Sequence, residues 1–164
     1  KARLIVSPLT KEDAREIYHI VGAMDALAAW HAAQLPERER LALSKGMGRI
    51  NETLASMETA PHPDYPKILE LHGEFHDLTL EAIDAPRLRA LHAATKPQAD
   101  RYRRIYSSGD FGQQRRSVEE HEEIIEALAE GNPEEALCRT QRHWMLAAER
   151  LSDIIAILGE RGSW

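Results

Sequence analysis

The sequence predicts an all-α protein, folded as a single antiparallel bundle of about six helices. Aromatic residues make up only 5% of the chain, and the abundance of Ala, Leu, Glu and Arg favours helices over strands. No segment alternates apolar and polar residues between hairpin turns, so the sequence predicts no sheet. The connections are short, which is typical of antiparallel neighbours in a bundle. The 164 residues are enough for one domain with a sizeable core.

The first two helices have recognisable start and stop signals. Thr10 with Asp13 resembles a capping box, and the helix that follows runs to about Gln34. Pro36 suits the first turn of a second helix, which continues to about Glu58. The proline-rich stretch "TAPHPDYP" then ends the helical pattern.

The third, fourth and fifth helices follow in the same way. The third begins near Asp64 and ends near Ile83, where "DAP" separates it from the fourth. The fourth runs to about Tyr106, and "SSGD" ends it. The fifth is predicted from about Phe111 to Glu130.

The start of the sixth helix is the best marked. Gly131 suits the C-terminal cap of the preceding helix. Asn132 suits an N-cap, with Pro133 at the first helical position and Glu135 three residues after the cap. The sixth helix then continues to about Leu158.

Composition limits the classes of partner. The formal charge is −6, and the basic clusters "RYRRIY" and "QQRRS" have acidic neighbours, so this chain alone is poorly suited to binding a phosphate backbone. The single cysteine, Cys138, excludes an internal disulfide and fits a reducing compartment. No apolar run is long enough to cross a bilayer or to act as a signal sequence. We therefore expect a cytoplasmic protein without a membrane partner.

Four histidines lie on the apolar stripes of three predicted helices. They are His72 and His76 in the third helix, His121 in the fifth and His143 in the sixth. Inward-facing imidazoles have polar nitrogens that must be paired, because burying them unpaired is costly. A divalent metal satisfies several imidazoles at once, and an i, i+4 pair lets one helix offer two ligands. The spacing therefore suggests a metal site.

A hydrogen-bonded core histidine is the alternative interpretation at each position. We keep this structural interpretation for His19, His31 and His92. The residue pattern by itself leaves both interpretations of the four inward histidines open, because spacing cannot establish that side chains converge in space.

Three segments together resemble the FCD domain, the FadR-type C-terminal effector-binding domain of GntR-family bacterial transcription regulators. They are "ELHGEFHDLTLEAIDAPRL", "EEHEEIIEALAEGNPEEA" and "RTQRHW", and the similarity extends from about residue 9 to residue 158. The resemblance implies a helical bundle that holds a metal through an Asp-x-x-x-His pair on one helix and single histidines on two later helices. Carried over by position, these histidines are His76, His121 and His143.

The sequence departs from the family pattern at three positions. His72 replaces the usual aspartate, and imidazole can still ligate. Val21 replaces an arginine four residues before the acidic Asp25, and this weakens the expectation of a carboxylate effector, because that arginine often helps hold an anion. Ala85 replaces an asparagine before Pro86.

The resemblance also implies a domain organisation and partners. Residues 1–8 are interpreted as a linker remnant from a missing N-terminal winged helix-turn-helix domain, and residues 9–160 as the effector-binding domain. We expect a homodimer that binds DNA only through the missing domain, under the control of a small-molecule effector, an organic acid. The inward face of the fourth helix offers Thr95, Gln98 and Tyr102 as effector contacts.

Ligation by four histidines predicts which metals can bind and what net charge the occupied site carries. Imidazole favours zinc or nickel, with iron and copper as alternatives, over magnesium and calcium. Four neutral imidazoles leave both positive charges of a dication uncompensated. An open coordination position should therefore attract an anionic effector.

Two other functions remain as alternatives. A mononuclear metalloenzyme would need a general base beside the metal, but Glu74 lies off the inward face. A carboxylate-bridged di-iron site would need two Glu-x-x-His motifs, and only Glu16 with His19 fits. Other nucleophiles lack a recognisable base and orienting group: Ser44, Ser56, Ser117 and Cys138. We therefore predict no enzymatic activity. A structural dimerisation module that binds no metal is the second alternative.

Overall fold

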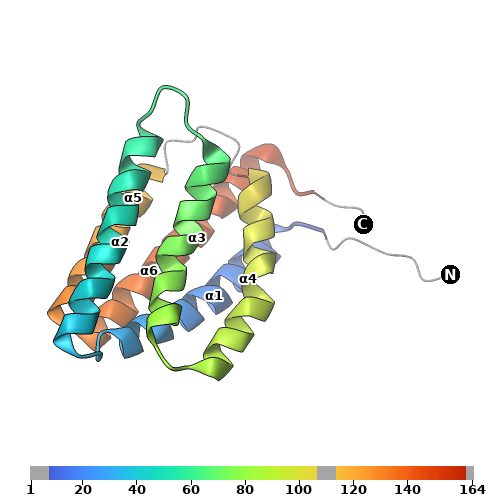
Figure 1. Cartoon of the computed structure of the whole chain (residues 1–164). Helices are drawn as coiled ribbons and strands as arrows, with labels where there is room; N and C mark the ends of the chain where they lie inside the picture. Colours follow the sequence, from blue (N-terminus) through green and yellow to red (C-terminus); the bar gives the residue numbers. More distant parts are fainter. Residues whose placement is uncertain (1–7, 107–113, 162–164) are drawn as a thin grey trace.

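The computed structural model describes residues 8–106 and 114–161, and over these ranges it contains six α-helices and no β-sheet (Figure 1). The helices are α1 (Lys11–Ala32), α2 (Glu37–Glu58), α3 (Tyr65–Ala82), α4 (Pro86–Tyr106), α5 (Gln114–Glu130) and α6 (Pro133–Leu158). The all-α prediction is confirmed. An isolated β-bridge between Leu9 and Arg161 joins the start of the bundle to its end.

The predicted caps form as hydrogen bonds. The Asp13 backbone N–H donates to the Thr10 hydroxyl at 3.1 Å and so begins α1. The Glu135 backbone N–H donates to the Asn132 side chain at 3.2 Å and so begins α6. Gly131 has φ of +69°, the left-handed conformation that ends α5.

The helix boundaries agree with the sequence to within a few residues. The first helix ends at Ala32 rather than at about Gln34, because a turn follows it. The predicted start of the fifth helix at Phe111 lies outside the described residues, as do positions 1–7 of the predicted linker. No helix in the described ranges is long and apolar enough to cross a membrane.

Helices α1 and α6 form the most extensive helix pair of the bundle, and α2 packs on α5 and α3 (Figure 1). Buried apolar residues group into separate clusters. One cluster joins α1, α4 and α6 around Tyr18 and Trp144. Another joins the C-terminal half of α1 to α2, α3 and α5 around Met47, Phe75 and Leu128. The inward histidines lie between these two clusters, since the His76 ring contacts both Phe75 and Trp144.

Candidate metal centre

Three of the four predicted ligands come together inside the bundle. His76 of α3, His121 of α5 and His143 of α6 each offer a ring nitrogen, and these atoms all lie within 4.8 Å of one another. The ring centroids are separated by 5.3 Å, 5.0 Å and 4.8 Å. All three side chains are buried. Three different helices therefore place three potential ligands around one point.

The walls of this cluster are apolar and aromatic. Phe75 stacks on His121, with ring centroids 3.8 Å apart, and Trp144 lies 5.1 Å from His76. Burial lowers the pKa of His76 and His121 well below the usual value, and neighbouring positive charges lower it further. Burial also lowers the pKa of His143, although the hydrogen bond with Glu120 opposes this. The rings are therefore neutral at pH 7, the form that can bind a metal.

Two of the three rings are oriented by acceptors on other helices. The Nδ1 atom of His121 lies 3.0 Å from Oδ1 of Asn51 on α2. The Nδ1 atom of His143 lies 2.7 Å from Oε2 of Glu120 on α5. Because both partners accept, Nδ1 carries the proton in each ring and Nε2 keeps a free lone pair. Metal-binding histidines in proteins are commonly oriented in this way.

Glu120 is itself held in place by Arg150 of α6. The guanidinium donates to the two carboxylate oxygens at 2.6 Å and 2.9 Å. Burial alone would raise the pKa of Glu120, but the hydrogen bonds from His143 and Arg150 outweigh it and lower the pKa to about 2. Glu120 therefore stays ionised over the physiological range and holds His143 in one tautomer.

The third ring, His76, faces a buried carboxylate. Its Nδ1 atom is 3.8 Å from Oδ2 of Asp25 on α1, and Nε2 of His92 on α4 is 2.9 Å from Oδ1 of the same residue. Burial raises the pKa of Asp25, and the interaction with His92 opposes this rise. Asp25 thus connects the histidine cluster to α4. His92 is buried, as its structural interpretation requires.

His72 lies beside the cluster but outside the group of three. Its ring centroid is 5.1 Å from that of His121, and its Nε2 atom is 3.5 Å from Oε1 of Glu58. Burial lowers the pKa of His72 well below the usual value, so this ring is also neutral. The fourth predicted ligand is therefore adjacent to the site, and its role as a ligand stays a prediction.

The three predicted effector contacts do not gather at the histidines. Thr95 donates a hydrogen bond to the Leu91 carbonyl of its own helix, and Gln98 is exposed. The Tyr102 hydroxyl donates to Asp13 at 2.5 Å, and its ring is buried in the cluster of α1, α4 and α6. Their contact with an effector stays a prediction.

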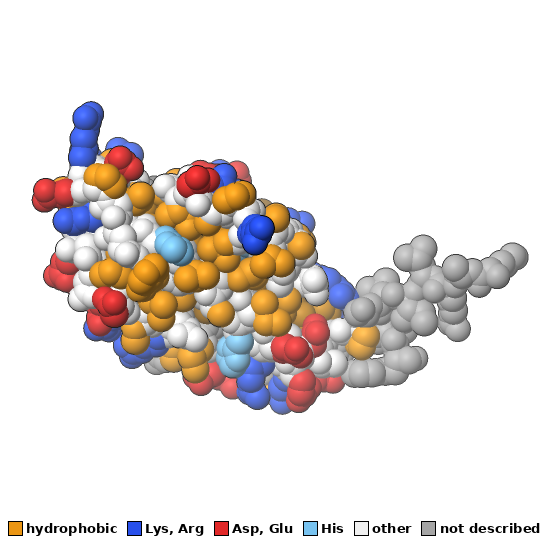
Figure 2. All heavy atoms as spheres, turned by 90° about the horizontal axis from the view of Figure 1, so that it is seen from below, with side chains coloured by type: hydrophobic (Ala, Val, Ile, Leu, Met, Phe, Trp, Pro, Cys, Tyr) orange, Lys and Arg blue, Asp and Glu red, His pale blue; other side chains and the backbone are white. Residues whose placement is uncertain are grey.

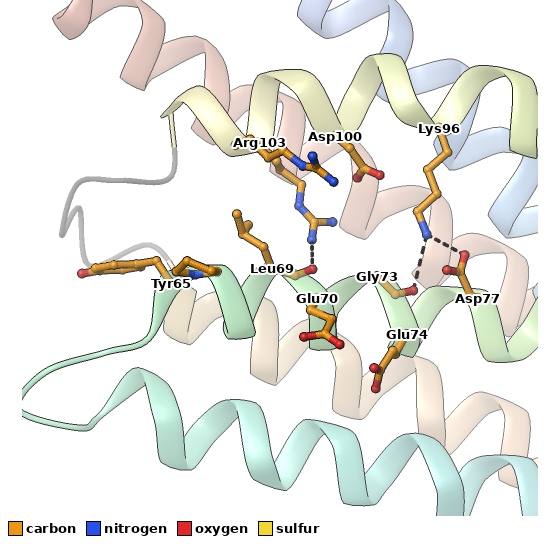
Figure 3. A pocket seen from close by; sticks show the side chains of 11 residues that line it. Tyr65, Leu69, Glu70, Gly73, Glu74, Asp77, Lys96, Asp100 and Arg103 are labelled. Carbon is orange, nitrogen blue, oxygen red and sulfur yellow. Dashed lines mark hydrogen bonds and ion pairs between the residues drawn. The ribbon is translucent and has the colours of Figure 1, made fainter.

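A pocket of about 720 Å³ lies between α3 and α4, and none of the three predicted contacts lines it. Figure 3 shows Arg103 reaching from α4 to the Leu69 carbonyl of α3, and Lys96 reaching to Asp77. Arg103 lines this pocket and also acts on the histidine cluster. Burial is the largest cause that lowers the pKa of His72, His76 and His121, and the positive charge of Arg103 lowers it further.

Sequence reasoning missed the residues that orient the rings. Asn51 could have been found, since it is a polar residue between Met47 and Leu54 on the apolar stripe of α2. Asp25 could have been found in the same way, since it is a charged residue on the apolar stripe of α1. No sequence pattern indicated that Glu58 is buried, because a glutamate at the end of a helix is ordinarily solvated.

The donor set fits a divalent transition metal. The Nε2 atom of His121 is buried and has no hydrogen-bond partner among the described residues, so an ion at the centre of the three rings would satisfy it. The arrangement of three neutral imidazoles and oriented tautomers suits zinc or nickel more than magnesium or calcium.

Comparison with known proteins agrees with this architecture. No curated protein matches the chain significantly. The family model of the FCD domain matches residues 16–146, which include all six helices in whole or in part and all four histidines. The chain therefore belongs to the FCD-domain family, the effector-binding domains of GntR-family transcription regulators.

Proposed function

We propose that this chain is a metal-dependent sensor domain, in which one divalent transition ion anchors a small organic acid. The effector would control DNA binding by the full-length regulator in the cytoplasm. The observation that carries the proposal is the convergence of His76, His121 and His143 with the Nδ1 atoms of two of them already held by acceptors. A bound ion would supply a positive centre with an open position for an anionic oxygen.

Two arginines support an anionic effector. Burial is the main cause that lowers the pKa of His72, and the positive charges of Arg103 and Arg150 lower it further. Arg103 comes from α4 and Arg150 from α6. Of the two, Arg103 is suited to the role that Val21 cannot perform, because guanidinium groups recognise carboxylates through paired hydrogen bonds and that of Arg150 is already paired with Glu120.

We expect small carboxylates to bind the metal-loaded protein through Arg103. Acetate, succinate and citrate, added to the cobalt-loaded protein, should change its visible spectrum, with one chain length binding best. Arg103→Gln should weaken that affinity about tenfold, since it removes a hydrogen bond to a charged group. Arg49→Gln, an exposed position on α2, is the matched control. Unchanged spectra with all three anions would contradict an organic-acid effector.

A regulator that controls the relative placement of two DNA-binding domains must be a dimer. We propose that α1 and α4 form the dimer interface. Ile20 and Leu27 on α1 and Leu91 on α4 are 44%, 43% and 62% exposed. The two helices pack against each other. Figure 2 shows hydrophobic side chains gathered on the face seen from below. An exposed apolar surface of this kind marks an interaction site.

Leu27→Glu combined with Leu91→Glu should shift the protein from dimer to monomer. Charges placed within an apolar interface lose hydration without gaining partners, so the dissociation constant should rise at least about 100-fold. Sedimentation equilibrium measures this change. Leu41→Glu on α2 is the control, because Leu41 is similarly exposed at 45% but lies on a different helix. A monomeric wild type, or a double variant that stays dimeric, would contradict the proposed interface.

A further inference from the structure

Glu58 is a buried carboxylate in an unfavourable position. Its side chain is 5% exposed, and neither carboxylate oxygen has a hydrogen-bond partner within the described ranges. It is the last residue of α2, where the helix dipole is negative, and the last turn contains no basic residue. Burial raises the pKa of Glu58 to about 7, so the ionised carboxylate is costly here unless a positive group lies nearby.

His72 is the group beside Glu58. Its Nε2 atom lies 3.5 Å from Oε1 of the carboxylate. The nitrogen nearer the carboxylate is therefore Nε2, and Nδ1 of the same ring is left to face another group. A cation bound at Nδ1 would add a positive charge close to this pair.

We propose that Glu58 is a positioning carboxylate of the metal centre, which directs His72 to act as a fourth ligand through Nδ1 and balances one charge of the ion. This inference rests on the metal binding proposed above. His72 lies one helical turn before His76, so both rings are on the same face of α3. The His72 ring is already 5.1 Å from the ring of His121.

The same arrangement recurs at all four histidines. Each has one ring nitrogen next to a side-chain oxygen from another helix, at distances of 3.5 Å, 3.8 Å, 3.0 Å and 2.7 Å for His72, His76, His121 and His143. The oxygens belong to Glu58, Asp25, Asn51 and Glu120, in the same order. This is the second layer that orients metal-binding histidines and raises their basicity. Four neutral imidazoles supply no negative charge, and Glu58 supplies one.

The variant Glu58→Gln separates this role from a merely structural one. Removing the carboxylate should lower zinc affinity about 10- to 100-fold, measured by competition with a chromophoric chelator at pH 8. The same variant should raise the melting temperature of the metal-free protein at pH 8, because it removes a buried and mostly ionised carboxylate that has no hydrogen-bond partner among the described residues. The two effects have opposite signs. Glu52→Gln, an exposed position on α2, should change neither measurement.

The substitution of Glu58 in a protein that already carries a variant at position 72 tests whether Glu58 acts through His72. In the variant His72→Asp, the carboxylate at position 72 carries its own charge and no imidazole needs positioning. Adding Glu58→Gln should then leave zinc affinity unchanged, so the two substitutions are strongly non-additive. Equal zinc affinity of wild type and Glu58→Gln would overturn the role of Glu58 alone. So would a loss of both zinc affinity and metal-free stability. A wild type that binds no zinc would overturn the metal centre itself, together with this inference.

Discussion

His121→Ala and His143→Ala should each abolish stoichiometric binding of zinc or nickel, whereas the wild type binds one ion per chain. Each substitution removes one of the three nitrogens that lie within 4.8 Å of one another. The imidazoles that remain do not hold a divalent ion at the affinity of the complete site. Metal analysis of protein purified without chelator, and again after reconstitution and desalting, measures the loss.

The same variants should lose the thermal stabilisation by metal. An ion that binds only the folded state at about 1,000 times its dissociation constant stabilises it by about 4 kcal/mol. For a chain of this size this corresponds to a rise of roughly 10 °C in the melting temperature of the wild type. Because each alanine also leaves an unpaired acceptor on Asn51 or Glu120, the quantity to compare is the increment caused by zinc or nickel.

His19→Ala and His31→Ala are the controls, since both histidines are exposed on α1. They should keep the metal and the thermal increment. Wild-type occupancy should also fall at acid pH, but only below the usual histidine range, because burial lowers the pKa of His76 and His121 and protons compete with the ion for imidazole only there. If the wild type binds no metal stoichiometrically, or if both inner variants keep it, the four histidines are core residues.

Gly22→Ala should destabilise the bundle strongly, because it separates α1 from α6. A Cβ atom on Gly22 would lie 2.4 Å from Cβ and 2.8 Å from Cγ of Trp144. These atoms are next to the backbone of α6, so rotation of the side chain cannot relieve the clash. We expect a loss of about 3 kcal/mol in the free energy of unfolding, at the upper end for overpacking. Chemical denaturation with urea measures it.

Gly48→Ala provides the matched control within a helix. No atom lies within 4 Å of the Cβ position at Gly48, which is inside α2. Alanine should therefore stabilise the protein by about 0.5–1 kcal/mol through its higher helix propensity. A loss of stability at Gly48, or no loss at Gly22, would contradict the assigned close contact between α1 and α6.

Much of the fold could be predicted from local signals. Thr10, Asn132 and Gly131 act within one or two turns of their own positions, so their roles could be inferred before any helix was placed in space. The same holds for the inward orientation of His76, His121 and His143, which follows from the apolar stripe of each helix. The effector contacts were harder to predict. A polar residue on a helix face bonds its own backbone, as Thr95 does, or a neighbouring helix, as Tyr102 does through Asp13.

The amino-acid sequence alone determined the six helices, their caps and the histidines that face inward, because each depends on residues three or four positions apart. Only the tertiary structure decided which nitrogens meet and which atoms orient them. Asn51 and His121 are 70 residues apart, and Glu120 and His143 are 23 residues apart. Their contacts follow from the packing of α2 on α5 and of α5 on α6. A helix pattern specifies which face is buried but not which helix covers that face. The contacts of Asp25 and Glu58 with the histidines therefore follow only from the packed bundle.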